Sequence, residues 1–344
     1  MARLNELVRN QGDSPIEGAA PLNKGEAQPF SFKAIEAHAA CASGEQNAQL
    51  ILEADEWHAK AAMELSSMVG AVRQAQKFSL DGITQVVHGF VDSLSQCDRL
   101  LVKAFSVERG GLVISNMVNT AIMSIKIGVG LKYTRDDLLR LGLAAILHDM
   151  GMCLIPDDIL NKQGPLSPEE RNLIKRHPEQ GAQALRRLGE GAAWIADIVL
   201  QEHERTGGQG YPHGLKGAEI HEYAQIIGLA DTFEALLHAR PHRKRFLPHE
   251  AVRELVMKEK ASFPTRILKC LIQQFSVFPL GTRVQLNTGE IGEVVELNPQ
   301  YPLRPVVKVY MDPGRVALAE PRLQDLSKTS LVHITEAVQD GQQE

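Results

Sequence analysis

Residues 143–152, Leu-Ala-Ala-Ile-Leu-His-Asp-Met-Gly-Met, place a histidine and an aspartate at the end of an apolar run. Burial of His148 and Asp149 at the end of a helix costs free energy unless something charged receives them, and a metal cluster would supply that charge. Further metal-capable side chains stand at the edges of later apolar runs: His177, His203 and Asp231. This part of the chain therefore predicts a metal site to which separate helices contribute.

The sequence around this stretch has mainly helical periodicity. Residues 112–275 read as successive helices interrupted by Gly and Pro. Residues 166–170, Leu-Ser-Pro-Glu-Glu, predict a helix start with Ser167 as the cap and the glutamates near the positive end of the helix. Upstream, apolar residues at three-to-four spacing predict two amphipathic helices, over about 46–77 and 80–105.

Near residue 278 the pattern changes to alternating β-branched runs, separated at 287–289 by Asn-Thr-Gly, which favours a hairpin. We expect residues 277–335 to form a small β-rich module, such as a five-stranded barrel of SH3-like size. The predicted fold class is mostly α: a multi-helix bundle with an N-terminal helical segment and a small C-terminal β-rich module.

Composition excludes several classes of protein. The 344 residues are 44% hydrophobic and 23% charged, as in ordinary globular proteins. The net charge of −5 argues against a broad surface for DNA or RNA. Four widely spaced cysteines predict reduced thiols rather than a disulfide frame. No apolar run approaches the roughly 18 to 20 residues that span a bilayer, and the N-terminus lacks a signal-peptide core, so we expect a cytoplasmic protein without membrane insertion.

Seven motifs, in order and with compatible gaps, cover roughly residues 110–275. They are HDMG (148–151), IPDDILNKQGPLSPEE (155–170), RHPEQG (176–181), HER (203–205), GQGYPHGLKGAEI (208–220), ADTFEAL (230–236) and RPHRK (240–244). In these motifs the chain resembles the HD-GYP family, the cyclic di-GMP phosphodiesterase branch of the HD hydrolase superfamily. The resemblance implies an HD-type helical bundle that hydrolyses cyclic di-GMP to linear pGpG, GMP or both.

The domain boundaries follow from these patterns. We expect a largely disordered N-terminus over 1–45, a helical segment over 46–107, the HD-GYP domain over 108–276, the β-rich module over 277–335 and a disordered tail over 336–344. The 46–107 segment either packs on the catalytic domain or serves as a dimerisation or signal-input module. A homodimer through these helices and a signalling protein as partner are therefore both open.

Hydrolysis of a phosphodiester needs a hydroxide at neutral pH and positive charge on the phosphate, and two metal ions roughly 3.5–4 Å apart supply both. Asp149 suits the bridging and catalytic position because its two oxygens can serve two ions. The expected ligands are His148, Asp149, His177, Glu202, His203 and Asp231. Imidazole and carboxylate ligands suit iron, manganese or zinc. The resemblance favours two or three divalent ions, with iron or manganese ahead of zinc.

Substrate contacts are expected from three further residues. The Tyr211 ring offers a face on which a guanine can stack, within a loop made pliable by its glycines. Arg240 and Arg243 can pair with phosphate oxygens through charge-assisted bonds. Without the resemblance, the basic run at 240–244 is equally well interpreted as a solvated surface.

The chain departs from the family pattern at three positions. Asn116 stands where the superfamily has its first metal-binding histidine, and a neutral amide is a poor substitute for imidazole. Met152 replaces the lysine that follows the HD-x-G motif and contacts the scissile phosphate. Glu202 replaces the first histidine of a pair, although a carboxylate can still bind a metal.

These departures leave alternative functions open. The leading hypothesis is a cyclic di-GMP phosphodiesterase. The second is a catalytically weakened or inactive HD-GYP signalling module that binds cyclic di-GMP or a partner protein. A third, an HD hydrolase of another phosphoester, fits the GYP loop less well.

Overall fold

The computed structural model describes residues 45–106, 111–162, 164–238, 246, 248–275, 282–296, 298, 304–329 and 331–338. The predicted disordered N-terminus lies almost wholly outside the described residues, as does most of the predicted tail. Arg240 and Arg243 also lie outside them. The fold is mostly helical with a small antiparallel sheet, which confirms the predicted fold class.

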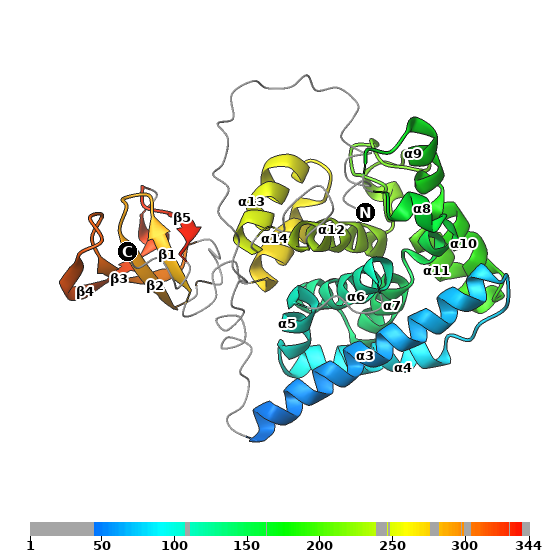
Figure 1. Ribbon diagram of the computed structural model, residues 1–344, viewed down its shortest axis with the longest axis horizontal. Coiled ribbons are helices and arrows are strands. Elements are labelled where there is room, and N and C mark those ends of the chain that lie inside the picture. The colour runs from blue at the N-terminus through cyan, green and yellow to red at the C-terminus, as the bar shows by residue number, and fades with distance from the viewer. Residues whose placement is uncertain are drawn as a thin grey trace.

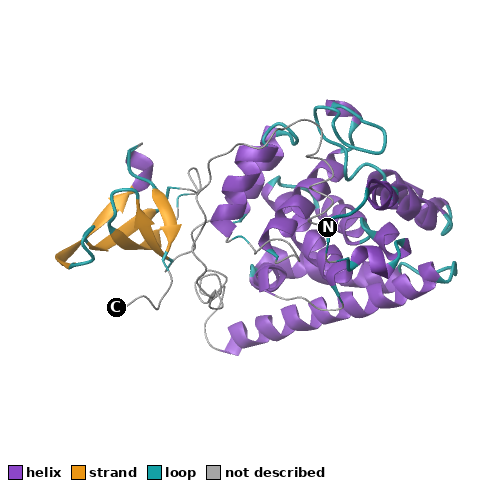
Figure 2. Ribbon diagram, turned by 45° about the horizontal axis from the view of Figure 1, so that its top comes forward, coloured by secondary structure: helices purple, strands orange, loops and turns teal. Residues whose placement is uncertain are grey.

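Three helices precede the central bundle: α3 (Glu45–Arg73), α4 (Asp81–Gln96) and α5 (Arg99–Ser106). The prediction of one continuous helix over 80–105 was wrong, because Cys97 is in an extended conformation and ends α4. In Figures 1 and 2, α3 is a long rod that runs along one side of the bundle. It packs against α4, α5, α6 and the η1 turn, so this segment is part of the helical body.

The central bundle contains nine α-helices and three 3-10 turns among the described residues. They are α6 (Leu112–Gly130), α7 (Arg135–Ile146), η1 (Met150–Leu154), α8 (Asp157–Leu160), α9 (Pro168–Lys175), α10 (His177–Arg186), η2 (Glu190–Ala192), α11 (Ala193–Val199), η3 (Gly217–Glu219), α12 (Glu222–Leu237), α13 (Pro248–Glu259) and α14 (Thr265–Gln274). The predicted start of α9 is confirmed: the Ser167 hydroxyl accepts from the Glu170 N–H, and the Glu170 carboxylate accepts from the Ser167 N–H.

Helix α6 is the centre of the bundle and contacts α7, α12, α5 and α14. It is long and apolar enough to cross a membrane by length and composition, so the expectation that no apolar run approaches this length was wrong. Most of this stretch (78%) is buried inside the fold, however. Its apolar surface is therefore accounted for by packing against other helices.

The C-terminal strands form one five-stranded antiparallel sheet in the order β4-β3-β2-β1-β5. They are β1 (Arg283–Leu286), β2 (Ile291–Glu296), β3 (Val306–Met311), β4 (Ala317–Asp325) and β5 (Ile334–Ala337), with the η4 turn (Leu326–Lys328) after β4. The predicted hairpin joins β1 to β2, and Gly289 supplies the positive φ of its turn. Val284, Val294 and Val307 form part of the buried side of the sheet.

Candidate metal centre

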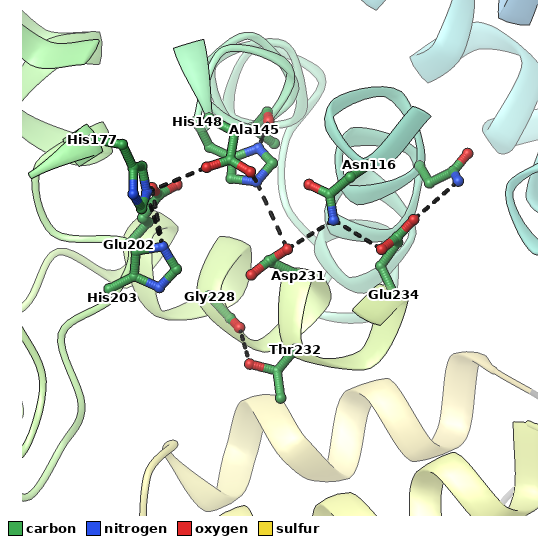
Figure 3. A network of polar contacts seen from close by, with 12 residues as sticks. Asn116, Ala145, His148, His177, Glu202, His203, Gly228, Asp231, Thr232 and Glu234 are labelled. Carbon is green, nitrogen blue, oxygen red and sulfur yellow. Dashed lines mark hydrogen bonds and ion pairs between the residues drawn. The ribbon is translucent and has the colours of Figure 1, made fainter. Parts of the chain in front are cut away.

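The expected metal ligands converge from four separate segments of the bundle. His148 and Asp149 follow α7, His177 begins α10, Glu202 and His203 follow α11, and Asp231 lies within α12. Figure 3 shows the side chains of His148, His177, Glu202, His203 and Asp231 gathered from their different segments. All six are at most 4% exposed.

Two of the histidines are fixed in orientation by backbone carbonyls. His148 Nδ1 lies 2.8 Å from the Ala145 oxygen, and His177 Nδ1 lies 2.7 Å from the Ile174 oxygen. A carbonyl can only accept, so each Nδ1 must carry the hydrogen. In the neutral ring the other nitrogen, Nε2, then presents its lone pair to the interior of the site, which is the arrangement a metal ligand requires.

One potential metal site is formed by Asp149, His177, Glu202 and His203, whose ligand atoms all lie within 4.8 Å of one another. His177 Nε2 is 3.3 Å from Asp149 Oδ1 and 2.9 Å from Glu202 Oε1. The Nε2 atoms of His177 and His203 are 3.0 Å apart. Two carboxylates and two imidazoles thus face one small volume.

A second potential site is formed by His148, Asp149 and Asp231. His148 Nε2 lies 3.6 Å from Asp149 Oδ2 and 3.9 Å from Asp231 Oδ1. Asp149 belongs to both groups and directs one oxygen to each, since Oδ1 faces His177 and Oδ2 faces His148. This is the geometry of a carboxylate that bridges two cations.

The chemistry of the cluster fits divalent cations. Among the described residues, His148 Nε2 and Glu202 Oε2 are buried and have no hydrogen-bond partner. Burial, together with the charge of Asp149, raises the pKa of Glu202 well above its usual range, and burial also raises the pKa of Asp231. Burial lowers the pKa of His177 to about 3, so that its ring is neutral. Neutral imidazoles and carboxylates that need a positive partner are a suitable donor set for such ions.

Comparisons with known proteins agree with this geometry. The HD domain family matches residues 107–265, and a KOW domain associated with HD domains matches residues 283–343. The cyclic di-GMP phosphodiesterase PA4108 of Pseudomonas aeruginosa is 35% identical over 176 residues, which are 51% of this chain and 42% of that protein. The cyclic di-GMP phosphodiesterase response regulator RpfG of Xanthomonas campestris is 38% identical over 143 residues, 41% of this chain and 37% of that protein.

The chain contains an HD domain over residues 107–265, and the matching relatives support its placement in the HD-GYP branch. It spans half or less of the length of these two curated relatives. A solved HDG"Y"P protein from Bdellovibrio bacteriovorus, Bd1817, matches with a TM-score of 0.55 and 20% identity over 70% of this chain and 76% of that one, which shows a shared fold.

Two glycines let the ligand-bearing segments of the HD-GYP domain approach closely. A Cβ on Gly151 would lie 1.9 Å from the backbone oxygen of His177, so the η1 turn and the start of α10 meet backbone to backbone. A Cβ on Gly228 would lie 2.3 Å from the Glu202 oxygen, which brings α12 against the Glu202–His203 segment. Larger residues at either position would separate the ligands.

The three departures from the family pattern have different surroundings. Glu202 lies inside the cluster, as its ligand role requires. Met152 is buried with Ile155, Leu166, Ile174 and Tyr211 in a separate small apolar group. Asn116 lies beside the site, and its amide nitrogen donates to Asp231 Oδ1 at 2.9 Å.

The glycine-rich loop over residues 208–220 places Tyr211 against the expected metal ligands. Its ring stacks on His203 with centroids 4.7 Å apart, and the Lys175 ammonium lies 5.6 Å from its centroid. The side chain is 9% exposed, and its hydroxyl has no hydrogen-bond partner within the described part of the chain. One ring face is thus already covered by His203, and the buried hydroxyl has a donor that no described residue uses.

Glu204 holds this loop in place, a role that the sequence did not suggest. Its carboxylate accepts from the backbone N–H groups of His213, Gly214 and Leu215 at 2.7–3.1 Å. The glycines were expected to make this loop pliable. In the structure the Gly210 backbone instead packs against that of Glu204, since a Cβ there would lie 2.4 Å from Glu204 Cα. The signal for this role in the sequence was the position of Glu204, an acidic residue between His203 and a glycine-rich loop.

Proposed function

We propose that this chain is a metal-dependent phosphodiesterase that hydrolyses cyclic di-GMP to linear pGpG, GMP or both. The observation that carries the proposal is the position of Asp149, shared between two groups of buried ligands. The names of the similar proteins, which are cyclic di-GMP phosphodiesterases, support the choice of substrate.

In this proposal His148, His177, Glu202, His203 and Asp231 hold the cations together with Asp149 as the bridging and catalytic residue. When bound, divalent cations lower the pKa of a water molecule and offset the charge that develops on the phosphate. Imidazole and carboxylate donors suit iron, manganese or zinc, and we propose iron or manganese because the resemblance to the HD-GYP family favours them. Cys153 belongs to neither group of potential ligands, and its Sγ donates to the Met150 carbonyl.

The remaining residues bind and orient the substrate. Burial raises the pKa of Tyr211 well above its usual range, so that its hydroxyl keeps its proton. It can therefore donate to a phosphate or guanine oxygen at the edge of the site. Arg240 and Arg243 are proposed as phosphate-binding residues on the basis of the sequence alone.

The proposal extends to the cellular context. We propose a cytoplasmic protein without nucleic-acid partners, in which residues 46–107 mediate homodimerisation or receive a signal from a protein partner. The β module over 277–335 is proposed as a separate domain, consistent with the KOW match that begins at residue 283.

The decisive test is cyclic di-GMP turnover by anaerobically purified protein loaded with Fe(II) or Mn(II). We expect hydrolysis by the wild type and its loss in Asp149→Ala, because that carboxylate faces both groups of ligands. Gly191→Ala is a matched control, since a Cβ at that position meets nothing within 4 Å. Absence of hydrolysis by metal-loaded wild type would contradict the proposed activity.

A second candidate function is a signalling module that binds cyclic di-GMP without hydrolysing it. Asn116 and Met152, which replace family residues of the catalytic machinery, favour this alternative. Equilibrium binding of cyclic di-GMP to metal-loaded wild type that shows no turnover would support it.

A further inference from the structure

The amide of Asn116 lies between two buried carboxylates of α12. Its Nδ2 atom donates to Asp231 Oδ1 at 2.9 Å and to Glu234 Oε2 at 2.8 Å, as Figure 3 shows. A side-chain amide has two N–H hydrogens, and these two contacts use both of them. Asn116, Asp231 and Glu234 are at most 4% exposed, so water does not compete for these bonds.

The same network continues away from the metal centre toward α3. Asn119, one turn after Asn116 on α6, donates from Nδ2 to Glu234 Oε1 at 3.2 Å. Its Oδ1 lies 3.3 Å from His58 Nε2, and His58 is a buried residue of α3. The oxygen of the Asn119 amide group is thus tied to a helix that precedes residue 107, where the HD domain match begins.

These bonds determine what Asp231 can do. Its Oδ1, the acceptor of the Asn116 bond, is also the atom that lies 3.9 Å from His148 Nε2. Asp231 and Glu234 are one helical turn apart and repel each other when both are ionised. A neutral donor between them offsets this repulsion and fixes the rotamer of Asp231 without adding a charge or occupying the metal site.

We propose that Asn116 is a positioning residue that, together with Glu234, holds Asp231 in its ligand orientation, and that Asn119 and His58 extend this support into α3. The inference rests on the proposed metal-dependent function. It gives Asn116 a role of its own, the support of Asp231, rather than only the replacement of a histidine ligand. It also makes α3, outside the matched domain, a part of the support of the metal centre.

The test is Mn(II) affinity of the full chain, measured by equilibrium dialysis, with metal content from elemental analysis. We expect Asn116→Ala to bind Mn(II) about 10-fold more weakly, as is common when a partner of a metal ligand is removed. Thr120→Val is the matched control on the same buried helix; its hydroxyl has no hydrogen-bond partner among the described residues, and we expect wild-type affinity. Circular dichroism of each metal-free variant verifies folding.

A double-mutant cycle distinguishes positioning from general destabilisation. Asn116→Leu keeps the side-chain volume and removes the donor, Glu234→Gln removes one of the two repelling charges, and the double variant Asn116→Leu/Glu234→Gln completes the cycle. We expect each variant to bind Mn(II) more weakly, with a non-additive effect of the two substitutions. The double variant is the one to use if the single variants do not fold.

Substitution of His58 tests the extension to α3. We expect His58→Phe to weaken Mn(II) binding several-fold, and to add little when Asn116 is already replaced. Wild-type affinity in His58→Phe would overturn the extension, and wild-type affinity in Asn116→Ala would overturn the positioning role. An additional equivalent of metal in Asn116→His would also overturn it, because Asn116 would then be only a missing ligand.

Failure of this inference differs from failure of the proposed activity. The inference is judged from metal affinity, whereas the activity is judged from hydrolysis by the wild type. A protein that binds Mn(II) through a supported Asp231 and does not cleave cyclic di-GMP would retain the inference and lose the activity.

Discussion

At the scale of single residues, the usefulness of each side chain depends on what its other atoms contact. His148 and His177 can offer Nε2 to a cation because a carbonyl three residues earlier accepts from Nδ1. Motif matching identifies such residues but cannot show these second contacts. Met152 is a further example, since its place in the motif suggests a lost phosphate contact whereas its side chain lies in an apolar cluster.

This surrounding leads to a prediction for Met152→Lys. The side chain is 1% exposed, so an ammonium there would be buried without a partner, and we expect a loss of about 3 kcal/mol in the free energy of unfolding with no gain in turnover. Urea denaturation measures the loss. Met152→Leu is the control and should cost less than about 1.5 kcal/mol. Higher turnover in a fully stable Met152→Lys variant would show that this side chain reaches the phosphate.

At the scale of elements, the site depends on how closely four segments approach one another. The η1 turn and α10 touch through Gly151, and α12 touches the Glu202 backbone through Gly228. A stack of helices with ordinary side chains at these contacts would keep the axes roughly 8–10 Å apart. The glycines allow shorter separations, and hence a cluster small enough for shared ligands.

We therefore predict that Gly151→Ala lowers Mn(II) affinity at least about 10-fold, because the new methyl group would push the His177 backbone away from Asp149. The free energy of unfolding should fall by about 1–3 kcal/mol through overpacking. Isothermal titration calorimetry and urea denaturation measure the two effects. Unchanged Mn(II) affinity would mean that the two segments can separate without moving the ligands.

The sequence predicted the elements better than the contacts between them. The helical bundle, the capped start of α9 and the β1–β2 hairpin follow from local patterns, and these were confirmed. The convergence of the ligands was expected from polar residues at the edges of apolar runs and from the family resemblance, but neither showed which atoms meet. The Asn116–Glu234 bond joins residues 118 positions apart on two buried helices, and no local pattern reports such a pairing. Neither Glu234 nor His58 was assigned a role for the same reason.

At the scale of the whole molecule, the buried acids make stability depend on both metal and pH. In the metal-free protein the pKa values of Glu202 and Asp231 lie above their unfolded values. Their contribution to stability is present at low pH and is lost as the pH rises through the raised pKa values. Burial lowers the pKa values of His177 and His203, that of His177 to about 3, so the His177 ring is neutral in the native protein at physiological pH.

We predict that a fixed concentration of Mn(II) stabilises the protein more at pH 8 than at pH 6. Protons compete with the cation for Glu202 and Asp231, whose pKa values are raised, and they compete more at the lower pH; His177, with a pKa of about 3, is neutral at both values and adds no pH dependence. At either pH, a free Mn(II) concentration of 100 times Kd should add about 2.7 kcal/mol to the free energy of unfolding. Because Kd should be lower at pH 8, this stabilisation should need less Mn(II) there. Chemical denaturation with and without Mn(II) measures this. An equal or larger effect of a fixed Mn(II) concentration at pH 6 would contradict the assignment of Glu202 and Asp231.

The burial of α6 has a consequence for how this protein could be recombined, in evolution or by design. The matched HD domain begins at residue 107, but α6 is covered on one side by α3 and α5, which come before that boundary. A fragment cut there would present a bare apolar helix to solvent and would tend to aggregate. The exchangeable unit is therefore residues 45–275, and a gene fusion that respects this boundary keeps the contact between His58 and Asn119 that we propose supports the metal centre.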